Sequence, residues 1–403
     1  MSLSRSLSLV ALAMVFILTF TGCEQAKIGF AKLAGLPTDD NVLFWTNSER
    51  DKAFRQMEVL TATRSIEAGE TPRLVEQGPA LTLSLLPEVG ADSIEQYMEN
   101  QNTAGILILH KGQIRLETYG NDYGPEGRWT SFSVAKSLTS TLVGAAIVDG
   151  YIGGLEDPLT QYIPQLTGSG YDGVSVKQLL TMQSGVRWNE DYTDPESDVA
   201  KFNLVTPEPG VDPIVSYMRT LPREYEPGTQ WRYNTGETNL IGVLVSSATG
   251  KPLADYLSEK VWAPYGMQAD AEWILNAGGT EIGGCCISAR LLDYALFGQF
   301  AMKGGAIAGT SVVPEGWFDQ AGSKQADIGR PGSGYGFQWW TYDDGSYAAQ
   351  GIFGQGIFID PARELVIASN SNWATATDPE MSKQRIGLYR SVQAAIDAES
   401  ATQ

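Results

Sequence analysis

The chain has 403 residues, of which 43% are apolar and 19% are charged, and its formal net charge is −19. This composition is typical of a globular protein, and the length suffices for one large domain or two ordinary ones. Nucleic acid and anionic membrane surfaces would both repel the negative charge, which argues against either as a partner.

The N-terminus has the pattern of an export signal. Arg5 precedes an apolar run, Leu7 to Phe20, which is too short for a comfortable membrane span. A Thr-Gly-Cys sequence follows and ends at Cys23, and small residues directly before a cysteine resemble the lipobox of bacterial lipoproteins. We therefore expect residues 1–22 to be a signal peptide and Cys23 to be acylated, with an uncleaved signal anchor as the alternative. Glu24 after the cysteine then implies a lipoprotein of the bacterial cell envelope, on the periplasmic face of the outer membrane if the host is Gram-negative.

The two remaining cysteines, Cys285 and Cys286, are adjacent in the sequence. Neighbouring Cα atoms lie about 3.8 Å apart, below the usual range for a disulfide. We therefore expect two small buried residues rather than a bridge. The spacing of histidine, cysteine and acidic residues indicates no metal cluster, and no cofactor is expected.

Strand patterns begin after a Gly- and Pro-interrupted region, residues 23–95, which we interpret as a tether and an N-terminal arm. Residues 105–119 form two β-like runs around Lys111-Gly112, which predicts a hairpin. The only histidine, His110, falls at the end of its first strand, where a polar residue beside the turn is expected. Residues 134–149 are apolar on most faces and stop at Gly150, as in a buried helix with a glycine after its last turn.

The middle of the chain, about residues 151–277, is helical and rich in loops. Strand patterns return after residue 331, so strands lie near both ends of the chain. This order favours an α+β fold for residues 96–398, with a central antiparallel sheet from both chain termini, flanking helices and an inserted, mostly helical subdomain. The expected helices beyond 134–149 cover 176–182, 238–248, 288–304 and 385–398, and the expected late strands cover 334–340, 356–360 and 365–369.

Ser133 and Lys136 form the only Ser-x-x-Lys pattern in the chain. Residues three apart on a helix share a face, so Lys136 can reach Ser133 without help from the rest of the fold. Burial and the positive end of the helix dipole disfavour the ammonium form and push the lysine toward a neutral amine that can act as a base. The only histidine lies beside a hairpin turn, which argues against a Ser-His-Asp site.

These residues carry a resemblance to a known group of proteins. Ser133-Val-Ala-Lys136 resembles the first motif of the serine β-lactamase and penicillin-binding superfamily. Tyr233-Asn-Thr235 is similar to the second motif of its class C and esterase branch, with Thr235 in place of the common asparagine. The resemblance implies a β-lactamase-like three-layer sandwich, and a Tyr233 that shares proton transfer with Lys136.

The third motif of the superfamily is normally Lys-Thr-Gly or His-Thr-Gly on an edge strand. The matching residues here are Ala349-Gln350-Gly351, which lack the cation. In β-lactamases and DD-peptidases that cation helps to hold the substrate carboxylate, so its absence argues against those substrates. Gly351 still permits close approach, and the Ile352 N–H would pair with the Ser133 N–H as an oxyanion hole.

Further segments narrow the resemblance to the 6-aminohexanoate-dimer hydrolase subgroup, from about Phe44 to Ala398. In that subgroup a tyrosine at the Tyr192 position closes over the substrate. Trp188 is either a substrate contact or ordinary packing of the inserted region, and the same choice applies to Trp373. The segments are Met182-Gln-Ser-Gly-Val-Arg-Trp188 with Glu190 and Tyr192, Gly284-Cys-Cys-Ile-Ser-Ala-Arg290, and Ala349-Gln-Gly-Ile-Phe-Gly-Gln355.

The expected function is a serine hydrolase that forms an acyl-enzyme on small esters or linear amides by a Ser-Lys-Tyr mechanism. A β-lactamase or DD-carboxypeptidase is the alternative, and a non-catalytic envelope binding protein with the same fold is a second one. The sequence identifies neither the particular substrate nor the oligomeric state.

Overall fold

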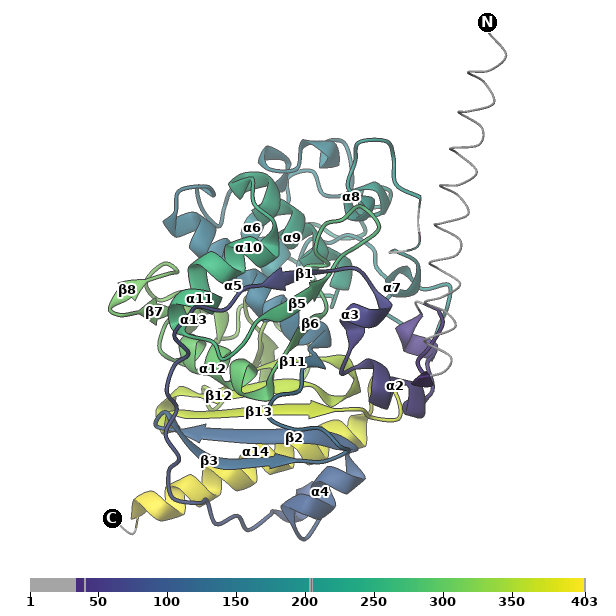
Figure 1. The fold of residues 1–403 in the computed structure, drawn as a ribbon. Coiled ribbons are helices and arrows are strands. Elements are labelled where there is room, and N and C mark those ends of the chain that lie inside the picture. Colours follow the sequence, from purple (N-terminus) through teal and green to yellow (C-terminus); the bar gives the residue numbers. More distant parts are fainter. Residues whose placement is uncertain (1–33, 40, 203, 205, 402–403) are drawn as a thin grey trace, which may run out of the picture.

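The computed structural model describes residues 34–39, 41–202, 204 and 206–401 (Figure 1). The expected signal peptide and the expected lipid attachment site at Cys23 lie outside the described residues. Within the described part, no helix combines the length and the apolar character that a membrane span requires.

A seven-stranded antiparallel sheet forms the centre of the fold, in the order β3-β2-β13-β12-β11-β10-β9. Two of its strands come from the first third of the chain and the other five from the last fifth, so the expected sheet from both chain termini is confirmed. Its strands are β2 (Thr103–His110), β3 (Gln113–Tyr119), β9 (Ser333–Tyr335), β10 (Trp340–Tyr342), β11 (Tyr347–Gln350), β12 (Gly356–Asp360) and β13 (Leu365–Ser371).

Helices cover both faces of this sheet, which makes three layers (Figure 1). The α-helices are α2 (Asn47–Ala53), α3 (Met57–Leu60), α4 (Ile94–Asn100), α5 (Ala135–Val148), α6 (Val176–Leu180), α7 (Asp198–Lys201), α8 (Pro213–Met218), α9 (Thr235–Thr249), α10 (Leu253–Leu257), α11 (Ala263–Tyr265), α12 (Leu291–Met302), α13 (Trp317–Ala321) and α14 (Pro379–Ala401).

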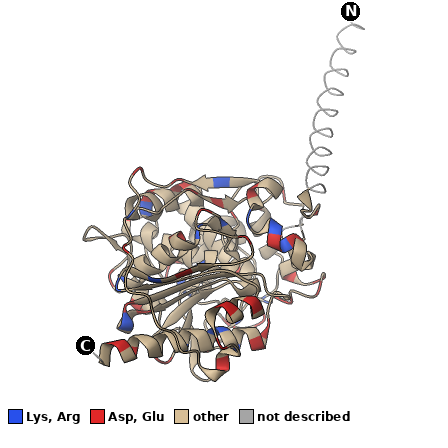
Figure 2. Cartoon of the chain, turned by 60° about the horizontal axis from the view of Figure 1, so that its bottom comes forward, with Lys and Arg blue, Asp and Glu red and all other residues tan. Residues whose placement is uncertain are grey.

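Strand β2 shows why the sheet is buried on both sides. Successive side chains of a strand point to opposite faces. Ile106 and Ile108 accordingly pack in a core with α4 and α14, whereas Leu107 and Leu109 pack in the larger core that contains α5 and α12. Charged residues lie mainly on the outer helices and loops, and the strands of the sheet carry few (Figure 2).

A second, smaller sheet supports the start of α5. Its strands are β1 (Thr63–Ile66), β5 (Ala271–Ile274), β6 (Ile287–Ala289) and β4 (Trp129–Thr130), in that order. Directly after β4, the Ser131 N–H donates to the Ile287 carbonyl at 2.7 Å, and the Ile287 N–H donates to Ser131 Oγ at 2.9 Å. The turn that precedes α5 is therefore fixed to β6.

Several local expectations need correction. The strand expected at 334–340 is split into β9 and β10, with residues 336–339 between them. The helix expected at 288–304 begins only at Leu291, because residues 287–289 pair with β4 and β5 as a strand. The strand with the third motif, β11, is not at the edge of the sheet, since β10 and β9 lie outside it. The sulfur atoms of Cys285 and Cys286 are joined in a disulfide, across a cis peptide bond with a Cα–Cα distance of 3.3 Å. The expectation of unbridged cysteines assumed a trans peptide with more widely spaced Cα atoms.

Candidate active site

Ser133 lies in a short 3-10 turn, η3 (Phe132–Val134), between β4 and α5. Phe132, directly before it, has a φ of 45°. Bulky residues rarely adopt this left-handed conformation, and it persists only where the surroundings enforce it. Here the Phe132 ring is packed against Phe54 and Phe353, at centroid distances of 4.9 and 5.3 Å. The turn thus presents Ser133 from a rigid, aromatic-packed support.

Lys136 lies one helical turn after Ser133 and is only 1% exposed. Its Nζ donates to Thr235 Oγ1 and to the Gly284 carbonyl, both at 3.0 Å. No carboxylate of the described residues forms an ion pair with it. Burial lowers the pKa of Lys136 to about 7, although the negative charge of Glu190 opposes this shift. At neutral pH much of the lysine is therefore a free amine that can accept a proton.

The approach of Gly284 to Lys136 depends on the absence of a side chain. A Cβ atom at Gly284 would lie 2.9 Å from Lys136 Nζ and 3.0 Å from the Thr235 carbonyl oxygen. Few real Cβ contacts are this short, so a larger residue would push the lysine amine aside or press on the first turn of α9. Gly284 is thus part of the lysine site, a role that the sequence did not suggest.

Tyr233 occupies the end of the loop before α9, close to both residues. Its ring centroid is 5.5 Å from Lys136 Nζ and stacks on Trp340, also at 5.5 Å, with an interplanar angle of 19°. Burial and the charge of Glu190 raise the pKa of Tyr233, and a side-chain interaction with Ser133 partly offsets the rise. The phenol therefore stays protonated at neutral pH and faces the Ser133 hydroxyl.

Glu190 fixes the residues around Lys136 through hydrogen bonds. Its carboxylate accepts hydrogen bonds from the Thr235 hydroxyl, from the Thr235 N–H at 2.9 Å, from the Tyr192 hydroxyl at 2.7 Å and from Trp188 Nε1. The Thr235 hydroxyl has one proton, and Glu190 receives it. Its oxygen is consequently left as an acceptor for Lys136.

A cavity of about 670 Å³ opens over Ser133 and Tyr233. Gly351 and Ile352 of the segment after β11 line it beside Ser133, and Tyr192 lines it from the inserted region. Aromatic and charged residues from elements late in the chain complete the wall, among them Arg330, Trp340, Trp373, Asp378, Lys383 and Arg385.

Gly351 lets the end of β11 lie against the turn that carries Ser133. A Cβ atom at Gly351 would come within 2.6 Å of the Ser131 carbonyl oxygen and 3.1 Å of Phe132 Cβ. Within the described residues, the N–H groups of Ser133 and Ile352 donate to no protein acceptor. Two N–H groups free to bind a developing oxyanion are what an acyl-transfer site requires.

Trp188 and Thr235 are buried and do not line the cavity. Trp188 is 5% exposed and packs edge-on against Phe202 and Tyr217, so it supports Glu190 and does not line the cavity. Thr235 is also buried and lies behind Lys136. Of the other expected residues, Tyr192 and Trp373 do reach the cavity wall.

The third-motif residues Ala349-Gln350-Gly351 carry no cation, as the sequence shows. Three basic residues nevertheless line the cavity, namely Arg330, Lys383 and Arg385. They follow the motif or precede it by many residues, so no spacing rule could place them in the site.

Residues 91–389 match the family model described as Beta-lactamase. The chain belongs to the β-lactamase family. Among relatives in this family, the 6-aminohexanoate-dimer hydrolase of Paenarthrobacter ureafaciens is 31% identical over 395 residues, which cover 94% of this chain and 98% of that protein. As a β-lactamase-family protein with named hydrolases as relatives, the chain is a serine hydrolase, and the resemblance seen in its motifs is confirmed.

Solved structures agree on the β-lactamase-family fold. A Bacillus anthracis protein assigned as a 6-aminohexanoate-dimer hydrolase superposes with a TM-score of 0.77 at 21% identity, over 90% of this chain and 98% of that one. A family VIII carboxylesterase superposes with a TM-score of 0.58 at 17% identity, over 78% of this chain and 99% of that one. At such identities the likeness concerns the fold.

Proposed function

We propose that this chain hydrolyses small linear amides or esters through an acyl-enzyme on Ser133. The observation that carries the proposal is Lys136, a buried lysine without a carboxylate partner in the described chain, next to Ser133 and Tyr233. Its pKa of about 7 suits a general base at neutral pH. The substrate class is supported by the relative that spans nearly the whole chain, which is named for hydrolysis of a linear amide dimer.

The hydrogen bonds of Lys136 support its role as the base. A neutral amine has two N–H groups and one lone pair. The two N–H groups are directed to Thr235 Oγ1 and to the Gly284 carbonyl, so the lone pair remains for another partner. Ser133, one helical turn away on the same face, is the partner that the geometry offers.

The reaction then has two halves. The Ser133 hydroxyl transfers its proton to Lys136 as its oxygen attacks the substrate carbonyl, and the N–H groups of Ser133 and Ile352 bind the oxyanion. The proton passes through Tyr233 to the leaving amine or alcohol as the carbonyl bond to it breaks. In the second half, Tyr233 and Lys136 accept a proton from water as its oxygen attacks the acyl carbonyl. They return that proton to Ser133 Oγ as the ester bond breaks and the acid leaves.

Two alternatives remain in view. A β-lactamase or DD-carboxypeptidase would use the same nucleophile, but the relative that spans nearly the whole chain is named for hydrolysis of a linear amide dimer. A non-catalytic binding protein is disfavoured because Ser133 and Tyr233 line one cavity and Lys136 is buried next to them.

A substrate panel with two variants tests this proposal. We expect Ser133→Ala to lower kcat/KM by roughly three orders of magnitude or more for a linear ω-amino amide dimer and for short p-nitrophenyl esters. Ser137→Ala is the matched control, since Ser137 is buried one turn along α5, donates to the Gln338 carbonyl at 2.7 Å and does not line the cavity. It should keep turnover close to that of the wild type.

Two results would overturn the proposal. If Ser133→Ala kept the wild-type kcat/KM, Ser133 could not be the nucleophile. If kcat/KM for a chromogenic cephalosporin equalled or exceeded that for the best ester or linear amide, the proposed substrate class would be wrong and the β-lactamase alternative would be favoured.

A further inference from the structure

Arg385 brings a positive charge from α14 to the cavity. The residue is 4% exposed, and its guanidinium lies over the Trp373 ring at 4.9 Å from the centroid. Nη1 donates to the Gln355 carbonyl at 3.1 Å and Nη2 to Gln350 Oε1 at 2.7 Å. Both acceptors are neutral amide oxygens.

The charge of Arg385 has no counter-ion in the described part of the chain. The cavity's own carboxylates are engaged elsewhere: Glu190 holds Thr235 and Tyr192, and Asp378 accepts from the N–H groups at the start of α14. Burying a charge without an opposite partner is costly, and an anion placed beside it would relieve that cost.

Another deeply buried arginine shows how such a side chain is otherwise satisfied. Arg50, 3% exposed, donates to five oxygens of Trp45, Asn47, Asn372, Trp373 and Ala374. Arg385 donates to two, and its buried Nε has no partner. Arg385, which has fewer hydrogen-bond partners than Arg50, lines the cavity, and Arg50 does not.

Two exposed cations extend the positive side of the cavity. Lys383 lies two residues before Arg385, and its Nζ is 4.0 Å from Glu380 with both side chains more than 60% exposed, so that pair contributes little. Arg330 is exposed and forms no ion pair with a described residue. On a chain of net charge −19, three cations around one cavity form a local attraction for an anion.

This positive group lies next to the reacting centre. Gln350, the acceptor of Arg385 Nη2, is the last residue of β11 and precedes the proposed oxyanion donor Ile352 by two positions. Gln350 is fixed in turn, because its Nε2 donates to the Tyr342 hydroxyl at 2.7 Å. The guanidinium is therefore connected to the strand on which the substrate carbonyl would be polarised.

We propose that Arg385, with Arg330 and Lys383, binds a carboxylate carried by the substrate, so that the enzyme prefers anionic linear amides or esters. The proposal rests on the proposed hydrolase function and adds the substrate's charge. A cation supplied by α14 would replace the one missing from the third-motif strand.

Two pairs of esters test this. The first is mono-4-nitrophenyl glutarate and its methyl ester, with the carboxylate on the acyl side. The second is 4-acetoxybenzoate and its methyl ester, with the carboxylate on the leaving group. In the wild type, kcat/KM for the carboxylate should exceed that for its methyl ester in at least one pair. Arg385→Gln should lower that ratio by about tenfold or more, because a charge-assisted hydrogen bond is lost.

Arg390→Gln is the matched control. Arg390 lies on the same helix, pairs with Asp344 and does not line the cavity, so its loss should leave the ratio unchanged. If Arg385→Gln does not fold, the double variant Arg330→Gln/Lys383→Gln, at exposed positions, should lower the ratio by a smaller factor, as should added salt.

The outcomes separate this inference from the proposed function. A wild-type ratio at or below one in both pairs would overturn the carboxylate site, as would a ratio unchanged in Arg385→Gln. An equal loss on carboxylate and methyl ester would also overturn it, since Arg385 would then only support Trp373 and Gln350. If the wild type turned over none of the four esters and no linear ω-amino amide dimer either, the proposed hydrolase function itself would fail.

Discussion

Lys136 sets the pH at which the site can react. Burial lowers its pKa to about 7, so below that value the amine is protonated and cannot accept the Ser133 proton. We expect kcat/KM to rise with pH and to level off above about pH 8. Burial raises the pKa of Tyr233 above its ordinary value, so ionisation of this phenol should cause no decline below about pH 10. A pH profile of ester hydrolysis measures both limbs, and a profile that is flat from pH 5 to 9 would exclude Lys136 as the base.

Glu190 offers a directional test of the same assignment. Its negative charge raises the pKa of Lys136, so Glu190→Gln should move the rising limb of the profile to lower pH, whatever it does to the maximal rate. Asp191→Asn removes a neighbouring exposed carboxylate that makes no hydrogen bond or ion pair with Lys136, and it should leave the limb in place. A shift toward higher pH in Glu190→Gln would contradict the charge effect.

At the level of residues, spacing in the sequence predicted some of the site residues but not all of them. Ser133 and Lys136 are three positions apart on one helix, and Tyr233 has its own motif, so all three could be named from the sequence. Arg385 lies more than 150 residues beyond Tyr233, and its place in the cavity depends on how α14 crosses the sheet. For Trp188 the sequence left a substrate contact and ordinary packing both open, and the structure shows a buried residue that packs against Phe202 and Tyr217.

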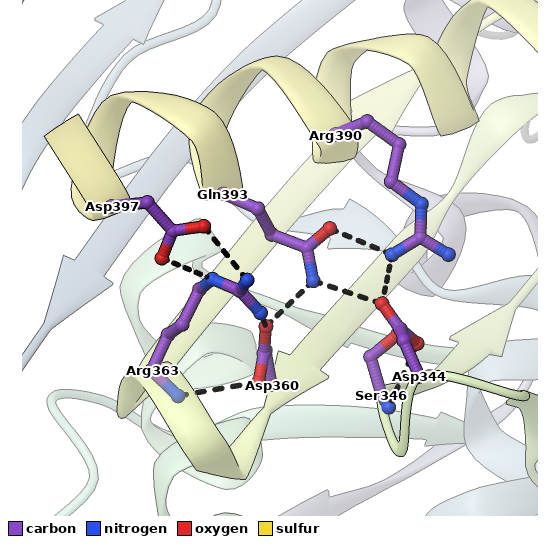
Figure 3. Close-up of polar contacts among 7 residues, drawn as sticks. All are labelled: Asp344, Ser346, Asp360, Arg363, Arg390, Gln393 and Asp397. Atoms are coloured by element: carbon purple, nitrogen blue, oxygen red, sulfur yellow. Dashed lines mark hydrogen bonds and ion pairs between the residues drawn. The ribbon is translucent and has the colours of Figure 1, made fainter.

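Helix α14 is joined to the sheet by a polar cluster at its C-terminal half (Figure 3). Arg363, just after β12, pairs with Asp397 through Nε and Nη2, both at 2.8 Å, and with the buried Asp360 at 2.8 Å. Gln393 donates to Asp360 at 2.6 Å and to Asp344 at 3.2 Å. The helix that carries Arg385 is thus fixed at two hairpin ends of the sheet.

We expect Arg363→Gln to lower the free energy of unfolding by about 1–3 kcal/mol, because the buried Asp360 carboxylate loses its cation. Arg219→Gln is the control, since the Arg219–Glu208 pair at 3.0 Å is largely exposed and should contribute less than about 1 kcal/mol. Urea unfolding followed by circular dichroism gives both values. Equal midpoints for the two variants would show that the cluster does not stabilise α14.

The elements that the sequence predicted are those with a local signal. The hairpin at 105–119, the buried helix α5 and the strands β12 and β13 have clear periodicity or turn residues at their ends. The small sheet has no such signal: β1 and β5 pair Thr63 with Ile274, more than 200 residues apart. Helix α14 begins six residues before the expected start, since its first turns are polar and exposed while Arg385 is already buried.

For the whole molecule, we propose that Cys23 is lipidated and anchors the enzyme in the bacterial cell envelope. The apolar run before Cys23 and the small residues next to it support this proposal. The protein should fractionate with membranes and yield an acylated N-terminal peptide beginning at Cys23 in mass spectrometry. Cys23→Ala should move it out of the membrane fraction. An unchanged membrane distribution for Cys23→Ala, or an unmodified cysteine in the wild type, would contradict the anchor.

Covalent labelling of the mature protein with a fluorophosphonate tests the central claim most directly. Intact mass spectrometry should show one phosphonate per chain, the peptide with Ser133 should carry it, and Ser133→Ala should show none while Ser137→Ala labels like the wild type. The rate of labelling should rise with pH through about 7, where Lys136 loses its proton. Full labelling of Ser133→Ala, or a label mapped to any other residue, would contradict the assignment of Ser133 as the nucleophile.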